Sequence, residues 1–144
     1  MPRTKLRIAI LAGGPSAEHA GSLKTGRMVL KNLDRKKYAS RLIVISKTGR
    51  WPVILQYLKK KFDCAFIAMH GEYGEDGTLQ KLLDRHRIRY TGSGARASRI
   101  GMDKIRSMRI FQKAGLRVPQ WQLFTKTRSV SHSPFAFPLV IKPA

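Results

Sequence analysis

Acidic residues, cysteine and long apolar runs are all scarce in this sequence of 144 residues. The one cysteine, Cys64, lies inside an apolar run and cannot form an internal disulfide, so we interpret it as a small core residue in a reducing compartment. No apolar run approaches the roughly 18 residues of a membrane span, and the N-terminus lacks the apolar stretch of a signal peptide. These absences argue against a membrane protein and favour a cytoplasmic one.

The shortage of acids leaves 8 Asp and Glu against 29 Lys and Arg, a formal net charge of +21. Such an excess attracts nucleic acid and other anionic surfaces without specificity. The basic residues are scattered mostly between the apolar positions of expected helices, and aromatic residues do not alternate with them. This pattern is typical of solvated helix faces rather than of a base-stacking surface, so we expect only non-specific contact with nucleic acid.

Apolar runs alternate with helical patterns along the first two thirds of the chain. Strands that alternate with helices form a parallel sheet through right-handed crossovers, so the predicted fold class is α/β with a parallel sheet. The expected strands cover residues 6–12, 41–46 and 63–69, and the expected helices contain residues 23–33, 54–62 and 77–87.

Beyond residue 100 the pattern predicts one helix and one short strand. The helix is expected to begin at Asp103, which suits an N-terminal cap, and to stop at Gly115. Its buried face is expected to contain Ile105, Met108 and Phe111. The strand is expected at residues 121–124.

Two lysines in this part of the chain occupy unusual positions. Lys104 lies at the start of the expected helix, where a cation is unfavourable unless it and the helix end face an anion such as phosphate. Lys142 is the single charge in an apolar run, so it either turns to the solvent or meets an anion in a cleft. The sequence alone is also compatible with both lysines being ordinary surface residues.

A strand, a glycine-rich loop and a helix follow one another in the stretch FIAMHGEYGEDGTLQ, residues 66–80. Ligands of open α/β sheets collect beyond the carboxyl ends of the strands. The first and third strands should end at the same edge, which brings Glu18 and His70 to one side of the domain. The alternative is a surface turn in which the glycines serve the backbone and Asp76 caps the next helix. The local pattern favours neither interpretation.

Taken together, six motifs resemble the D-alanine–D-alanine ligases of the ATP-grasp superfamily. The resemblance covers almost the whole chain, but only the front portion of such an enzyme. It implies a Rossmann-like, pre-ATP-grasp domain over residues 1–100 and the start of the ATP-grasp central domain over residues 101–144. The motifs are LAGGPSAEHAGSL (11–23), ISKTGRW (45–51), FIAMHGEYGEDGTLQ (66–80), YTGSGARAS (90–98), GMDKIRSM (101–108) and PLVIKPA (138–144).

The resemblance also implies an activity and roles for particular residues. Such ligases use ATP to phosphorylate the carboxylate of one D-alanine, and a second D-alanine attacks the acyl phosphate to give the dipeptide for peptidoglycan. By motif, Glu18 would hold the ammonium of the first D-alanine with Ser22 beside it, and His70 would face the acyl phosphate. Lys104 and Lys142 would contact the ATP phosphates, since fixed positive charge stabilises a transferring phosphoryl group. A homodimer through the N-terminal domain is implied as well.

Two departures from the family pattern limit what this chain is expected to do alone. Ala20 and Gly21 stand where the family usually has an acid and a valine. No Asp or Glu follows Asp103, so the carboxylates that would hold two Mg²⁺ ions are missing and we expect no metal ligands here. We therefore predict a catalytically incomplete N-terminal fragment. The alternatives are a basic, non-catalytic protein that binds RNA or another polyanion, and an ATP-grasp ligase for a different amino acid.

Overall fold

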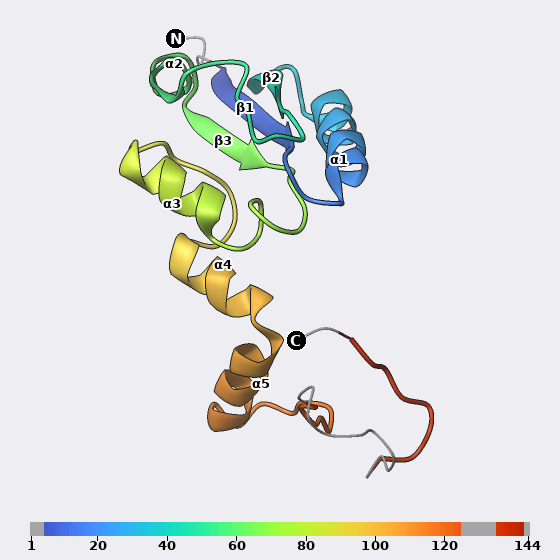
Figure 1. Cartoon of the computed structure of the whole chain (residues 1–144). Helices are drawn as coiled ribbons and strands as arrows, with labels where there is room; N and C mark the ends of the chain where they lie inside the picture. The colour runs from blue at the N-terminus through green and yellow to red at the C-terminus, as the bar shows by residue number, and fades with distance from the viewer. Residues whose placement is uncertain (1–4, 125–134, 143–144) are drawn as a thin grey trace. The chain divides into compact units, whose positions relative to one another are not determined.

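The structure, a computed structural model, describes residues 5–124 and 135–142, so the last two residues of the PLVIKPA motif lie outside the described part. The chain divides into two compact units, Met1–Arg99 and Ile100–Ala144. No helix among the described residues is long and apolar enough to cross a membrane. The elements are β1 (Leu6–Gly13), α1 (His19–Asn32), β2 (Tyr38–Ile45), α2 (Leu55–Lys61), β3 (Cys64–Ile67), α3 (Thr78–Arg85), α4 (Ala95–Met102) and α5 (Lys104–Lys113) (Figure 1).

The three strands of the first unit form one parallel sheet in the order β2-β1-β3, which confirms the predicted sheet. β1 lies in the centre and pairs with β2 along its whole length, whereas only Ile8–Leu11 of β1 pairs with Cys64–Ile67 of β3. The third strand is therefore shorter than the predicted 63–69. The central place of β1 explains the apolar run that follows Arg7 in this strand, because both faces of the strand are covered there.

Helices cover both faces of this sheet, so the first unit has three layers (Figure 1). α1 packs on one face, and its Gly26 allows a close approach, since a Cβ there would lie 2.7 Å from the Ala12 Cβ. α2 and α3 pack on the other face through buried leucines. Cys64 belongs to the α1 side but is only half-buried, and burial raises the pKa of its thiol. The leucines are Leu58 of α2 and Leu79 and Leu83 of α3.

The second unit begins with a well-capped helix, as the sequence predicts. Asp103 Oδ1 accepts a hydrogen bond of 2.8 Å from the backbone N–H of Arg106, and α5 ends two residues before Gly115, which has a φ of +74°. Ile105 and Met108, which were expected to be buried, are half-buried.

Other predictions for the later part of the chain were wrong. Phe111 is 45% exposed rather than buried, because the described residues of the second unit form no sheet that could cover this helix face. Residues 121–124 form no strand. Helix α4 was not predicted, and none of its residues is buried.

An ion pair fastens the start of β1 to the residue before β3. The Arg7 guanidinium donates to Asp63 Oδ1 at 2.6 Å and Oδ2 at 3.1 Å, and the Arg7 backbone N–H donates to Oδ2 at 2.8 Å. These hydrogen bonds lower the pKa of the Asp63 carboxyl from 3.8 to about 2. Asp63 is thus bound in its ionised form at the end of the sheet opposite the glycine-rich loop.

This ion pair predicts a pH dependence of stability. A carboxylate with a depressed folded-state pKa stabilises the fold fully above its ordinary pKa of 3.8, and the contribution is lost as the pH falls toward about 2. The Tm of Asp63→Asn, measured by circular dichroism, should therefore fall less than that of the wild type as the pH is lowered from 3.8 to about 2. Glu72→Gln, at an exposed acid without a described partner, is the control and should keep the wild-type slope. Equal slopes in Asp63→Asn and the wild type would contradict the prediction.

Candidate functional site

Two loops meet at the carboxyl ends of β1 and β3. Ser16 joins them, because its hydroxyl donates to the His70 carbonyl at 2.7 Å and accepts from the Glu18 N–H at 3.2 Å. A Cβ built on Gly71 would lie 3.4 Å from Glu18 Oε1. The strand order thus brings Glu18 and His70 to one side of the domain, which confirms the expected juxtaposition.

His70 is held between a hydroxyl and a carboxylate. Its Nε2 lies 2.9 Å from Thr25 Oγ1 on α1, and its Nδ1 lies 3.8 Å from Glu75 Oε1. Glu75 is itself fixed, since its other oxygen accepts from the Gly71 N–H at 2.8 Å. The imidazole is still 36% exposed, so the ring is oriented while one part of it faces the solvent.

Glu18 directly precedes α1 and presents an exposed carboxylate. It occupies the N-cap position, yet its side chain makes no cap hydrogen bond. Among the described residues it has no ion-pair partner, although cations outnumber acids in this chain by 29 to 8. A free carboxylate at this edge is suited to receive a cationic group, such as an ammonium, from a bound molecule.

Ser22 is fully buried under the two strand ends. Its hydroxyl accepts from the Gly13 N–H at 2.8 Å and donates to the Ala68 carbonyl at 2.9 Å. The donor and one acceptor position of the hydroxyl are therefore used by the backbone. Ser22 fastens the end of β1 and the residue after β3 to α1, and so holds together the two loops that carry Glu18 and His70.

The glycine-rich loop is also a turn fixed by hydrogen bonds, although Gly77 and not the expected Asp76 is the N-cap of α3. Asp76 accepts from the backbone N–H groups of Tyr73 and Thr78 at 2.9 and 2.8 Å, next to the start of α3. Burial raises the pKa of Asp76, but these hydrogen bonds outweigh it and lower the pKa overall. Gly77 has a φ of +88°, which favours glycine at this position.

Lys104 and Lys142 belong to the second unit. Lys104 is the first residue of α5, and both side chains are exposed and without an ion-pair partner among the described residues. Exposure of Lys142 agrees with the interpretation in which it turns to the solvent. A contact of either lysine with phosphate stays a prediction. In the described part of the chain, no group of three or more His, Cys, Asp or Glu residues could hold a metal ion.

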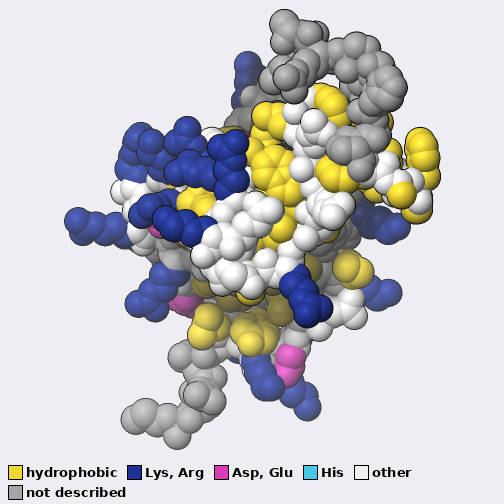
Figure 2. Space-filling model, turned by 90° about the horizontal axis from the view of Figure 1, so that it is seen from below, with side chains coloured by type: hydrophobic (Ala, Val, Ile, Leu, Met, Phe, Trp, Pro, Cys, Tyr) yellow, Lys and Arg dark blue, Asp and Glu magenta, His cyan; other side chains and the backbone are white. Residues whose placement is uncertain are grey.

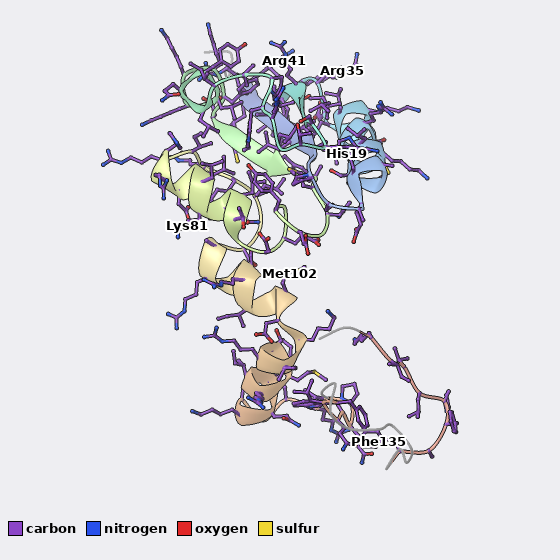
Figure 3. All side chains as sticks on the ribbon, viewed as in Figure 1. His19, Arg35, Arg41, Lys81, Met102 and Phe135 are labelled. Atoms are coloured by element: carbon purple, nitrogen blue, oxygen red, sulfur yellow. The ribbon has the colours of Figure 1, made fainter. Side chains whose placement is uncertain are left out.

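Three residues that fix the loops were not identified from the sequence: Ser16, Thr25 and Glu75. Thr25 lies seven residues after Glu18, two turns along the same helix face, so helical spacing could have indicated it. Glu75 belongs to the HGEYGED stretch, where any of the three carboxylates could have been the partner of His70. Figure 3 shows His19, which also lies at this end of α1; its Nδ1 is 2.6 Å from the Gly14 carbonyl.

Comparisons with known proteins agree with this geometry. The family described as "D-ala D-ala ligase N-terminus" matches residues 7–58 and 52–93. The D-alanine–D-alanine ligase of Halorhodospira halophila is 41% identical over 143 residues, which cover 99% of this chain and 45% of that protein. The corresponding ligase of Bacillus anthracis is 37% identical over 96% of this chain and 45% of its own length. The chain thus spans a little under half the length of these curated relatives.

Solved structures show the same fold. The D-alanine–D-alanine ligase from Coxiella burnetii superposes with a TM-score of 0.76 at 26% identity, over 88% of this chain and 46% of that one. The ligase from Bacillus anthracis complexed with ATP superposes with a TM-score of 0.72 at 36% identity, over 88% and 42%. The family match covers most of the first unit, with its parallel sheet and both site loops. This chain therefore belongs to the family of D-alanine–D-alanine ligase N-terminal domains.

Proposed function

We propose that this chain is the N-terminal part of a D-alanine–D-alanine ligase that makes the dipeptide for peptidoglycan in the cytoplasm, and that it is inactive by itself. The observation that carries the proposal is the free Glu18 carboxylate next to Gly71, the residue that follows the oriented His70, at the carboxyl edge of the sheet. Relatives of this name are about twice as long as the chain, which supports the view that the catalytic machinery is only partly present here.

The site residues then have different tasks. Glu18 binds the ammonium of the first D-alanine, because a free carboxylate and an ammonium form a charge-assisted hydrogen bond. His70, fixed by Thr25 and Glu75, faces the acyl phosphate and stabilises its charge by hydrogen bonding. Ser22 positions both loops through the backbone; its direct contact with D-alanine stays a prediction.

ATP would be held partly by Lys104 and Lys142, whose exposed and unpaired ammonium groups suit phosphate oxygens. One relative was solved with ATP bound, which supports a nucleotide in this family. When bound, ATP supplies the phosphoryl group that activates the D-alanine carboxylate. For Mg²⁺ the described residues do not fit, since they include no suitable carboxylate cluster, so we assign no step to the metal within this chain. Association into a homodimer through the first unit is part of the proposal.

The experiment that tests this function measures phosphate release from Mg²⁺-ATP as a function of D-alanine concentration. The chain alone is compared with the same chain fused to the matching C-terminal part of the Bacillus anthracis ligase. We expect D-alanine-dependent release from the fusion and none from the chain alone, because the described residues include no carboxylate cluster for the metal.

Two results would contradict the proposal. Release by the chain alone would show that it is catalytically complete. A fusion that is folded by circular dichroism but releases no phosphate with D-alanine would show that this N-terminal part does not serve that substrate. Omission of D-alanine is the control for ATP hydrolysis unrelated to ligation.

A further inference from the structure

Two adjoining hollows in the first unit are lined by residues of α2 and of the end of α3, which is the end of α3 away from the site loops. One has a volume of about 300 Å³ and the other about 450 Å³, and both are open to the solvent. They share Leu55, Gln56 and His86. The first is lined in addition by Lys59, Arg85 and Arg87, and the second by Trp51, Pro52, Val53 and Ile54.

The first hollow is lined by positively charged side chains. Lys59 comes from α2, whereas Arg85 and Arg87 come from the end of α3 and the residue pair after it. None of these three cations forms an ion pair with a described residue, and no acid lines the hollow. Asp84 lies beside Arg85 in the sequence, but its carboxylate interacts with Tyr90, whose pKa it raises together with burial. The hollow thus presents several cations without a counterion from the protein.

Helix dipoles explain only part of this arrangement. Cations in the last turn of a helix are favourable, which accounts for Lys59 and Arg85 taken singly. Arg87 lies outside the helix and has a φ of +54°, a conformation that favours glycine. Lys and Arg side chains project from many places on the visible face in Figure 2, with few acids between them. At the hollow, cations from α2 and from the end of α3 line one space. The helix dipoles do not explain why these cations lie together.

The second hollow supplies an apolar surface beside these charges. Trp51 lies on its wall and is half-buried against the core under α2 and α3. The Trp51 indole N–H donates to the Tyr73 hydroxyl at 3.1 Å, which fixes the orientation of the ring. An aromatic ring in a fixed orientation next to cations is the combination that single-stranded nucleic acids use, with bases on the ring and phosphates on the cations.

We propose that the paired hollows bind one nucleotide unit of a single-stranded RNA, with the phosphate against Lys59, Arg85 and Arg87 and the base against Trp51. This site is independent of the ligase function, because it shares no residue with the loops that carry Glu18 and His70. A second copy of this chain does not suit the surface, since two such cationic faces repel each other. The net charge of +21 favours association with RNA in general, and the hollows are the proposed binding site on this surface.

The test measures binding of the full chain to a fluorescein-labelled 12-nucleotide oligo(U) by fluorescence anisotropy. The double variant Lys59→Gln/Arg87→Gln should bind roughly tenfold more weakly and show a shallower salt dependence, since about 0.7 counterions are released for each phosphate contact with a single strand. The matched control, Arg35→Gln/Lys36→Gln, removes the same charge from the exposed turn after α1 and should change the affinity by less than about twofold. Arg35 is labelled in Figure 3.

A second measurement tests the apolar half of the site. In a Trp121→Phe background Trp51 is the only tryptophan, so its fluorescence reports on the hollow directly. Oligo(U) should quench this emission, and an abasic oligonucleotide of the same charge should quench it much less. Equal losses of affinity in the two double variants, absence of quenching, or equally tight binding of an acidic peptide would each overturn the proposal. Uridine monophosphate that binds as tightly as the oligonucleotide would overturn RNA as the ligand.

Discussion

Ser22→Ala is expected to lower the free energy of unfolding of the first unit by about 2–4 kcal/mol. The hydroxyl satisfies two buried backbone groups, the Gly13 N–H and the Ala68 carbonyl, and no other described group bonds to it. Alanine would leave both groups without a partner, and each unsatisfied buried group costs roughly 1–3 kcal/mol. The loss of the small side chain itself adds little. The effect is large because one hydroxyl serves two backbone groups on neighbouring strands.

The measurement is urea denaturation in a Trp121→Phe background, so that the fluorescence of Trp51 follows the first unit alone. Ser93→Ala is the matched control, because Ser93 is exposed and its hydroxyl makes no hydrogen bond with a described residue; it should unfold at the wild-type urea concentration. Ser22→Cys, which keeps the size with a weaker hydrogen-bonding group, should fall between the wild type and Ser22→Ala. A Ser22→Ala midpoint equal to that of Ser93→Ala would refute the assigned role.

The sheet could be predicted from the sequence because its burial leaves a strong local signal. β1 is covered on both faces, so its eight residues form a nearly unbroken apolar run, and the glycines that follow mark where it ends. The alternation with helices then fixes the parallel order, and the order places the ends of β1 and β3 at one edge. For this reason the meeting of Glu18 and His70 could be predicted from the sequence.

Other features depend on contacts between distant residues and leave no local signal. The polar bonds of Ser22 reach back 9 residues and forward 46, and a serine at the start of a helix gives no sign of its burial. Trp51 adjoins His86 only because α2 and α3 pack on the same face of the sheet. The sequence therefore indicated scattered cations without an aromatic partner, whereas the fold brings both to one place.

Phe111 shows the opposite error: the helical pattern predicts that it is buried, but in the described part of the chain it is exposed. Helical spacing predicts which face of α5 is apolar, but burial needs a second surface to pack on it. Phe111 is 45% exposed, so the described residues do not provide that surface. Periodicity identifies the face of a helix, and only tertiary structure determines what covers it.

In the fused ligase, Glu18→Gln is expected to reduce kcat/KM for D-alanine by about 10- to 100-fold. This range corresponds to the roughly 1.5–3 kcal/mol of a hydrogen bond between charged groups. Glutamine keeps the size and one acceptor oxygen of the side chain but removes the charge that would attract an ammonium. Because Glu18 has no described ion-pair partner, its neutralisation should leave the stability of the domain nearly unchanged.

The lack of an acid at residue 20 strengthens this prediction. Ala20 stands where a second acid is usual in the family pattern, so no neighbouring carboxylate on α1 can take over the charge of Glu18. Glu72→Gln removes an equal charge from the exposed part of the His70 loop and is the matched control, with an expected change of less than about twofold. Equal losses in the two variants would show that only the overall charge of the loops matters. A loss confined to Glu18→Gln, with unchanged urea midpoints, would support this carboxylate as the group that binds the substrate ammonium.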